Sequence, residues 1–578
     1  MWFPDRAELL SADEGASFTL LAWHELFDES TPDSFRPRLY DCISFLEELR
    51  IISDEAKKDA RWKAYLPIVM AEAIEFLSCS SVVLDNYPHT LHALNANSKS
   101  VDPDKVKSLA NVLLDKMSDY NEILEHSVRE KSRNLPKSKA KMLDALGHLA
   151  TRACADGVHG VQCKALNFRA LLSENVDAAV DSILKVSSAK TSEWECFIGL
   201  NAEHDEHRSV ITKSAFTALP KSKKPLGEVG DEFLKLTEGC LRAYTVVSAK
   251  GASGAVATAA EPIQQLIDFS NFAYNYNAIK LSDWILAQCG RIQILVNIRQ
   301  SSIYKVQPRR QPGRLPVDIL SQLPISRFPD QLLRALEQYT IAQTSADPKV
   351  RFVNLWVALE TLVGRGGDSI ADHAIDAVSP ILAFGRTREL LKYLAISLRG
   401  IELLEHSPAS KEYFPLSTTE KIRRDELLLV LCGKRGIAAQ KHLCRAVAHH
   451  RLILYRLFEL HKTLSDSKSF HQSIISSKNR CEWQLRRIYR ERNLLIHSGR
   501  CSQSLSYLHD NLNQYFTTAV WHVVNSIVNT ASFSVADSFS KSSIEITHTL
   551  DVIQREPAKC CVGHVLNRHS PYESELIF

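Results

Sequence analysis

A short basic stretch near the C-terminal end of the chain combines the residue types needed for proton transfer at a phosphate. In the segment CEWQLRRIYRERNLLIHSGR (481–500), Arg492 and Asn493 precede His497. If the segment is helical, Asn493 and His497 share one face, a single turn apart. Histidine can exchange a proton near neutral pH, whereas arginine keeps its charge. Residues 478–500 include seven basic and two acidic side chains, and this excess of positive charge suits a phosphate backbone.

An arginine followed by a histidine at this spacing is not specific by itself. The same spacing occurs at two other places, and two further pairs have six residues between them: Arg445 and His450, Arg456 and His461, Arg152 and His159, Arg399 and His406. The context of Arg492 differs from these. Only Arg492 is followed by a polar residue that faces the histidine one turn later, and only this match ends on a helix-stopping Ser498-Gly499.

Arg492 also lies in an unusual place on its own helix. By three-and-four spacing it falls in the middle of an apolar stripe that includes Ile488 and Ile496. Burying an unpaired guanidinium would cost several kcal/mol. In the segment VRFVNLWVALETLVG (350–364), Glu360 falls among apolar residues in the same way. We therefore expect Glu360 to be the partner of Arg492. A buried ion pair between two core helices, with no chemistry attached, is the alternative.

The C-terminal part of the chain has strong helical patterns that would position these residues. Apolar residues at helical spacing predict helices over 330–345, 350–364, 445–465 and 481–500, and the last of these ends at Gly499.

At these residues the sequence resembles the HEPN superfamily, specifically its Apea-like branch. The resemblance covers roughly 330–530, and four ordered blocks carry it: FVNLWVALETLVG, LYRLFELHKTLSD, CEWQLRRIYRERNLLIHSGR and SYLHDNLNQYFTTAVWHVV. It implies a bundle of about four helices that usually dimerises, with two motifs facing each other across one cleft. Many members are endoribonucleases that need no metal or other cofactor, and some act in antiphage defence or as toxins.

Carried onto this chain, the resemblance makes Arg492 and His497 the motif pair and Asn493 the polar residue beside the arginine, with Glu360 in a supporting role. RNA supplies its own nucleophile, the 2′-hydroxyl. His497 or its dimer mate would act as general base and acid, and Arg492 would stabilise the developing phosphorane charge. The expected products are a 2′,3′-cyclic phosphate and a 5′-hydroxyl.

Other basic residues are candidates for holding RNA. On the same helix we expect this role for Arg486, Arg487, Arg490 and Arg500. Two further basic runs, 129–141 and 220–225, are predicted to be solvated loops, with a secondary RNA-docking surface as the alternative. The net charge of the whole chain is only +3, so the case for nucleic acid rests on local clusters.

Changes in composition divide the chain of 578 residues into several parts. Residues 1–190 are predicted to be mostly helical and have no recognised role. Short segments rich in β-branched and aromatic residues, at 194–201, 241–249 and 294–306, flank an Ala-rich helical pattern, and they predict a small mixed α/β unit over 191–307.

The parts that follow include the candidate site. The proline-rich QPRRQPGRLP predicts a linker at 308–316. The helical domain is expected over 317–530, with 366–445 as an insertion and 531–578 as a weakly ordered tail. The fold class predicted for the whole chain is therefore mainly α.

The composition is that of an ordinary globular protein, with 45% apolar and 24% charged residues. The thirteen cysteines include no Cys-x-x-Cys and no Cys/His grouping of zinc-site spacing, so we expect free, mostly buried thiols and no metal site. We see no signal segment and no apolar run long enough for a membrane helix, so the expected location is cytoplasmic.

The sequence leaves three functional hypotheses open. The first is a ribonuclease that the N-terminal region restrains or targets in response to an unidentified ligand or protein. The second is a HEPN dimer that binds RNA, a nucleotide or a partner without cutting. The third is a purely structural role for Arg492 and Glu360.

Overall fold

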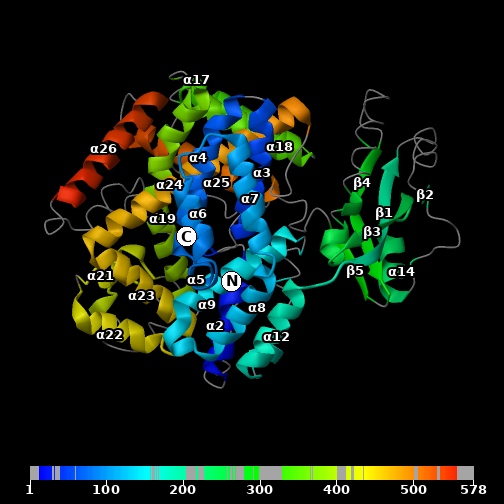
Figure 1. Ribbon diagram of the computed structural model, residues 1–578, viewed down its shortest axis with the longest axis horizontal. Helices are drawn as coiled ribbons and strands as arrows, with labels where there is room; N and C mark the ends of the chain where they lie inside the picture. The colour runs from blue at the N-terminus through cyan, green and yellow to red at the C-terminus, as the bar shows by residue number, and fades with distance from the viewer. Residues whose placement is uncertain are drawn as a thin grey trace. The chain divides into compact units, whose positions relative to one another are not determined.

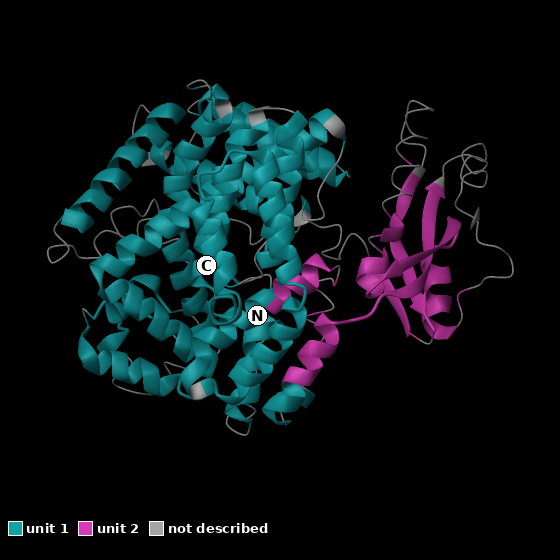
Figure 2. Ribbon diagram, viewed as in Figure 1, with its two compact units in different colours: residues 1–148, 168–179, 308–578 teal, residues 149–167, 180–307 magenta. Residues whose placement is uncertain are grey.

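The computed structural model is mainly α-helical and contains a small unit of β-strands with helices, which confirms the predicted fold class (Figure 1). The structure describes most residues between Leu9 and Arg555; the longer gaps are 203–216, 219–224, 268–278, 298–327 and 400–411, and shorter ones include 36–39, 418–421, 500–504 and 530–533. The predicted linker at 308–316 lies outside the described residues. The chain divides into two compact units (Figure 2).

Helices make up the N-terminal part of the chain before the strands, as predicted. They are α2 (Glu14–Phe27), α3 (Cys42–Lys58), the 3₁₀ helix η2 (Ala60–Ala64), α4 (Tyr65–Cys79), α5 (Ser81–Asn86), α6 (Pro88–Ala96), α7 (Pro103–Lys116), α8 (Tyr120–Arg133), α9 (Leu135–Ala155), α11 (Phe168–Leu172) and α12 (Val176–Ser187). The basic run 129–141 was predicted to be a loop, and this prediction is wrong, because its residues form the end of α8 and the start of α9. The run 220–225 lies almost wholly outside the described residues.

The C-terminal part consists of helices throughout its described residues. They are α17 (Asp330–Thr344), α18 (Pro348–Val363), α19 (Ile370–Arg399), α21 (Arg424–Leu431), α22 (Gly436–Ala446), α23 (Arg451–Ser465), α24 (Ser467–Ser498), α25 (Leu505–Asn529) and α26 (Val535–Arg555). The helix predicted at 481–500 is the second half of α24. Its predicted stop is confirmed, because Gly499 has a φ of 66° and donates its N–H to the Leu495 carbonyl.

Six helices surround the core of the C-terminal bundle. Its buried residues come from α17, α18, the first half of α19, the second half of α24, α25 and the start of α26. Trp356 of α18 is fully buried and lies against Tyr489 of α24, with their ring centroids 5.6 Å apart. This core brings the helices predicted at 330–345, 350–364 and 481–500 together.

The sequence suggested that the segment 366–445 is an insertion in the bundle. The structure shows that this prediction is wrong. Ala371, Ala374 and Leu382 of α19 lie in the bundle core itself. The second half of α19 continues into a neighbouring core, together with α21, α22, α23 and the first half of α24. The predicted tail is also wrong in part, because α26 adds buried residues to both cores.

Most of the N-terminal helices belong to the same compact unit as the C-terminal bundle, whereas the end of α9 and most of α12 belong to the other unit. The unit that contains the bundle comprises 1–148, 168–179 and 308–578. The sequence predicted an N-terminal region that ends at 190 and a separate helical domain over 317–530. This division is wrong, because residues of both segments belong to one compact unit. Side chains of α3 and α4 reach α24, as described below, and hold the two parts together.

The second unit contains an antiparallel sheet with the strand order β2-β3-β1-β4-β5. The strands are β1 (Ser192–Ala202), β2 (Thr217–Ala218), β3 (Leu241–Ala249), β4 (Ile279–Cys289) and β5 (Ile292–Asn297). The sequence pattern predicted β1, β3 and part of β5 but missed β4, which pairs with β1. Its start, Ile279 to Ser282, alternates apolar and polar residues as a strand does, but Asp283 interrupts this alternation after only four residues.

Helical residues cover both faces of the sheet. On one face, Ala255, Ala259 and Ile263 of the Ala-rich segment pack on Ile198 and other strand residues. On the other face, Phe233 of α14 (Gly227–Leu236) packs on Phe197. This arrangement is the predicted mixed unit.

Two further properties concern the whole described chain. None of the described cysteines forms a disulfide, and only Cys42, Cys163 and Cys196 among them are buried. Among the described helices, none combines the length and the apolar character needed to cross a membrane.

Candidate functional site at the C-terminal end of helix α24

The three motif residues lie in the last two turns of α24. Arg492 and Asn493 are half-buried, and His497 is exposed in the final turn. Arg492 Nη1 donates a hydrogen bond to Asn493 Oδ1 at 3.0 Å. Its Nε is buried without a hydrogen-bond partner among the described residues. The guanidinium is therefore held by its neighbour and still has a donor unused, while the histidine faces solvent.

Neighbouring helices bring two more ionisable groups to this end of the bundle. Arg351, in the first turn of α18, donates from Nε to the Ser345 carbonyl at 2.5 Å, and Gln343 Nε2 donates to Asn513 Oδ1 of α25 at 3.2 Å. His509 of α25 is 2% exposed, and neither ring nitrogen has a partner in the described part of the chain. Burial and the nearby Arg351 charge lower the pKa of His509 to about 4, so the ring is neutral at pH 7.

The expected pair of Glu360 with Arg492 does not form. Glu360 Oε1 accepts a hydrogen bond from Trp356 Nε1 at 2.6 Å, one turn earlier on α18. Trp356 of α18 lies against Tyr489 of α24. Asp372, which follows the end of α18, pairs with Arg486, which precedes Tyr489 on α24. The two helices therefore run in opposite directions. Glu360 therefore points towards the earlier part of α24, away from Arg492, and its supporting role is corrected.

Two of the predicted RNA-binding arginines are committed to carboxylates in the interior. Arg487 is 3% exposed and binds the carboxylates of Glu48 from α3 and Glu72 from α4, with N–O distances between 2.7 and 3.1 Å. Its guanidinium also lies over the Tyr40 ring, 4.2 Å from the centroid. Arg490 pairs with Glu48 as well. We call Arg487, Arg490, Glu48 and Glu72 the buried ion-pair cluster.

The cluster corrects the prediction for these arginines. Burial by itself opposes the charge on Arg487, yet the Glu72 carboxylate and Tyr40 raise its pKa above the ordinary value. A guanidinium enclosed in this way cannot reach a phosphate outside the bundle. Arg486 is more accessible and pairs with Asp372 at 2.5 Å, whereas Arg500 lies outside the described residues.

In the described competing pairs, the histidines His450 and His461 have structural partners. Arg456 pairs with the buried Glu25 and lies 3.7 Å from the centroid of the Phe35 ring. His461 Nδ1 lies 2.6 Å from the Leu431 carbonyl oxygen. His450 caps α23 by accepting the Ile453 N–H. His159 and His406 fall outside the described residues. Among the described Arg–His pairs, only the pair on α24 has an exposed histidine.

The sequence contained signals for the residues that its interpretation missed. Phe45, Glu48 and Ile52 share one helix face at three-and-four spacing, so Glu48 is a carboxylate within an apolar stripe. His509 lies in the same way between Leu505 and Leu512. Arg492 and Glu360 were singled out because each lies within an apolar stripe of its helix. The same criterion would have found Glu48 and His509.

Comparison of the chain with protein-family models, with curated proteins and with solved structures gives no match in any of the three. The resemblance to the HEPN superfamily thus remains a prediction that rests on the residues quoted above.

Proposed function

We propose that this protein is a metal-independent endoribonuclease of the HEPN type, which its N-terminal helices restrain and which acts in antiphage defence or toxin-like RNA cleavage. One observation carries the proposal: Arg492, oriented by Asn493, shares the end of α24 with an exposed histidine, His497. Among the competing pairs, Arg456, His461 and His450 have structural partners in the protein.

The proposed chemistry uses only these side chains and the RNA itself. His497 takes the proton of the 2′-hydroxyl, whose oxygen attacks the adjacent phosphorus. The 5′-oxygen leaves with a proton from a second acid, for which the His497 of a dimer mate is the candidate. Arg492 neutralises the phosphorane, and its bond to Asn493 keeps the guanidinium in place. The products are a 2′,3′-cyclic phosphate and a 5′-hydroxyl.

Exposed apolar residues at the same end of the bundle support a homodimer. Ile496 beside His497, Val350 at the start of α18 and Ile341 near the end of α17 are between 43% and 47% exposed. The bond from Gln343 to Asn513 and the short link from α24 to α25 bring these three helix ends together. Exposed apolar side chains at this end of the bundle suit a two-fold interface that places two motifs in one cleft.

The buried ion-pair cluster supports regulation by the N-terminal helices. Glu48 and Glu72 hold Arg487, which lies five residues before Arg492 on the same helix. A trigger that moves α3 or α4 would therefore act directly on the helix that carries the motif.

The test is cleavage of a mixed transfer RNA and messenger RNA pool in EDTA. Wild type, His497→Ala and the matched control His471→Ala, altered in the second turn of the same helix, are compared after circular dichroism has verified their folding. We expect wild type and His471→Ala to cut, and His497→Ala to be inactive. Mass spectrometry of the fragments should find 2′,3′-cyclic phosphate ends. Equal cutting by folded His497→Ala would contradict the proposal.

A second candidate is a HEPN dimer that binds RNA or a partner without cutting. The described motif offers one exposed histidine, whereas cleavage needs both a base and an acid, and this favours binding without cutting. No cutting by any of these proteins, combined with RNA binding that Arg492→Ala abolishes, would select this alternative.

A further inference from the structure

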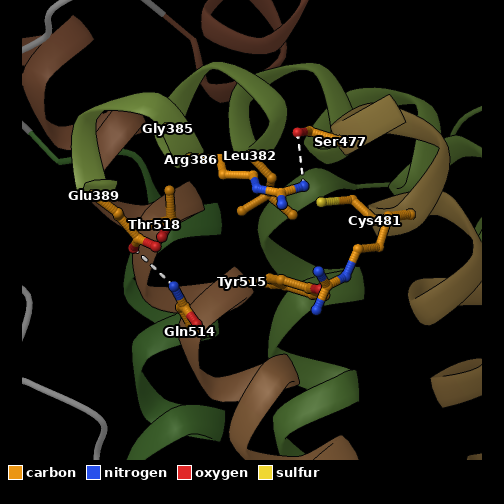
Figure 3. Close-up of a pocket in the computed structure, with 10 residues that line it drawn as sticks. Leu382, Gly385, Arg386, Glu389, Ser477, Cys481, Gln514, Tyr515 and Thr518 are labelled. Carbon is orange, nitrogen blue, oxygen red and sulfur yellow. Dashed lines mark hydrogen bonds between the residues drawn. The ribbon is translucent and has the colours of Figure 1, made fainter. Parts of the chain in front are cut away.

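A small cavity lies in the C-terminal bundle, away from the motif. It has a volume of about 60 Å³, is partly open to solvent, and is lined by residues of α19, α24 and α25 (Figure 3). One water molecule needs only about 15 Å³ measured in this way, so there is room for a group of several heavy atoms. No step of the proposed RNA cleavage uses this cavity.

Charged side chains from two helices line the cavity. Arg386 of α19 donates from Nη1 to Ser477 Oγ at 3.0 Å, and Arg480 of α24 also contributes to the wall. Glu389 accepts a hydrogen bond from Gln514 Nε2 at 2.7 Å. Figure 3 shows the Arg386–Ser477 and Glu389–Gln514 pairs on different sides of the cavity. The wall thus combines two arginines with a carboxylate that an amide holds in place.

A glycine contributes to the space in this cavity. Gly385 lies within the 30-residue helix α19, where glycine is less favourable than alanine. A Cβ atom at this position would meet no atom within 4 Å. Packing therefore does not require a glycine, and its missing side chain leaves the cavity wall open.

We propose that this cavity binds a phosphate group, either as free orthophosphate or as the phosphate of a nucleotide. Two guanidinium groups from separate helices can donate to a tetrahedral oxyanion from two directions. The Glu389 carboxylate disfavours a second anion on its side and accepts a hydrogen-bond donor, such as a protonated phosphate oxygen or a hydroxyl. This proposal does not depend on the ribonuclease function.

A bound phosphate would connect three helices of the bundle. Tyr515, which also lines the cavity, donates its hydroxyl to Gln484 Oε1 of α24. The ligand would add contacts between α19 and α24 beside this link, so binding should stabilise the folded bundle.

The experiment measures binding to the full-length protein by equilibrium dialysis and by thermal unfolding. The probes are orthophosphate, AMP and adenosine, at constant ionic strength. Gly385→Leu fills the cavity and Arg386→Gln removes one cation, while Gly385→Ala and Arg435→Gln, at the exposed residue that precedes α22, are matched controls. Circular dichroism verifies that each variant is folded.

We expect orthophosphate or AMP, but not adenosine, to bind wild type and raise its melting temperature by a few degrees. Both effects should be lost in Gly385→Leu and Arg386→Gln and kept in the two controls. Binding of orthophosphate identifies free phosphate as sufficient, whereas binding of AMP alone identifies an ester. Failure of both probes to bind, or unchanged binding in the folded Gly385→Leu and Arg386→Gln variants, would overturn the proposal.

Discussion

Arg487 and Glu48 form a buried ion pair although 439 positions separate them in the chain. Arg487 donates from Nε and Nη2 to the two oxygens of Glu48, at 3.1 and 2.8 Å, in a bidentate arrangement. The pair joins the helix that carries the motif to the N-terminal helix α3.

Replacing Arg487 with alanine should destabilise the protein strongly. The change leaves the Glu48 and Glu72 carboxylates without their shared cation, and a broken buried pair costs about 3–5 kcal/mol. Arg486→Ala breaks a more exposed pair with Asp372 and should cost less than about 1 kcal/mol. Urea unfolding curves measure both. Equal stability of the two variants would contradict the structural role of the cluster.

Arg492→Ala should lower the rate of RNA cleavage by about 10²–10³-fold, as when one donor to a developing oxyanion is removed. The half-buried guanidinium lacks a carboxylate partner among the described residues, so its loss should change the melting temperature little. Arg492→Lys keeps the charge but not the planar fork, and should recover only part of the rate. The measurements are single-turnover cleavage and a thermal melt. Unfolding of Arg492→Ala would instead favour the purely structural role.

His509 should make the protein less stable in acid. Its pKa is about 4 in the folded state and near 6.5 in the unfolded chain, so the unfolded chain binds more protons between these values. Stability therefore falls as the pH decreases from about 6.5 towards 4, by roughly 2 kcal/mol between pH 7 and 5. His509→Leu should remove this part of the pH dependence, and the exposed His548→Leu should not. Urea unfolding at pH 7 and 5 tests the difference.

Asp144 should contribute stability at neutral pH that disappears in strong acid. Burial opposes its ionisation, but hydrogen bonds from His148 and Ser81, at 2.7 Å for the Ser81 N–H, lower its pKa to about 2. A lowered folded-state pKa gives stability above about pH 4, and this stability is lost as the pH falls through 2. Asp144→Asn should cost about 1–3 kcal/mol at pH 7. Its difference from wild type should shrink below pH 4, and a constant difference across this range would count against the assignment.

Ile496→Asp should weaken the proposed dimer. The residue is 47% exposed beside His497, and a charge there disfavours an apolar interface. Ile544→Asp on α26, where the isoleucine is 69% exposed, is the matched control and should leave the assembly unchanged. Sedimentation velocity at several protein concentrations gives the dissociation constant. If the wild type sediments as a monomer throughout, the dimer model is wrong.

The sequence was sufficient for much of the helical architecture, because helix ends have local causes. The end of α24 at Gly499 and the start of α18 at Pro348, capped by Asp347, depend on residues within one turn. Apolar spacing likewise marked the faces that form the bundle core. The insertion assigned to 366–445 was wrong because it was inferred from the spacing of the family blocks, and the packing of α19 has no local signature.

The partners of the charged residues could not be predicted in the same way. Helical spacing shows that a charge lies in an apolar stripe, but it does not say which helix faces it. Arg492 and Glu360 both satisfied the rule, yet α18 and α24 run in opposite directions, and the two side chains face different ends. Arg487 instead binds carboxylates more than 400 positions away, which no local pattern can specify.

The unbroken length of α24 fixes a geometric relation between the phosphate cavity and the motif. Its 32 residues extend over about 48 Å, and Cys481 at the cavity lies eleven positions before Arg492. Eleven residues make three turns and about 20°, so both positions face nearly the same side of the helix. A single residue inserted between them would turn His497 by about 100° relative to the cavity without replacing any side chain. Such an insertion would therefore separate the effect of orientation from that of composition.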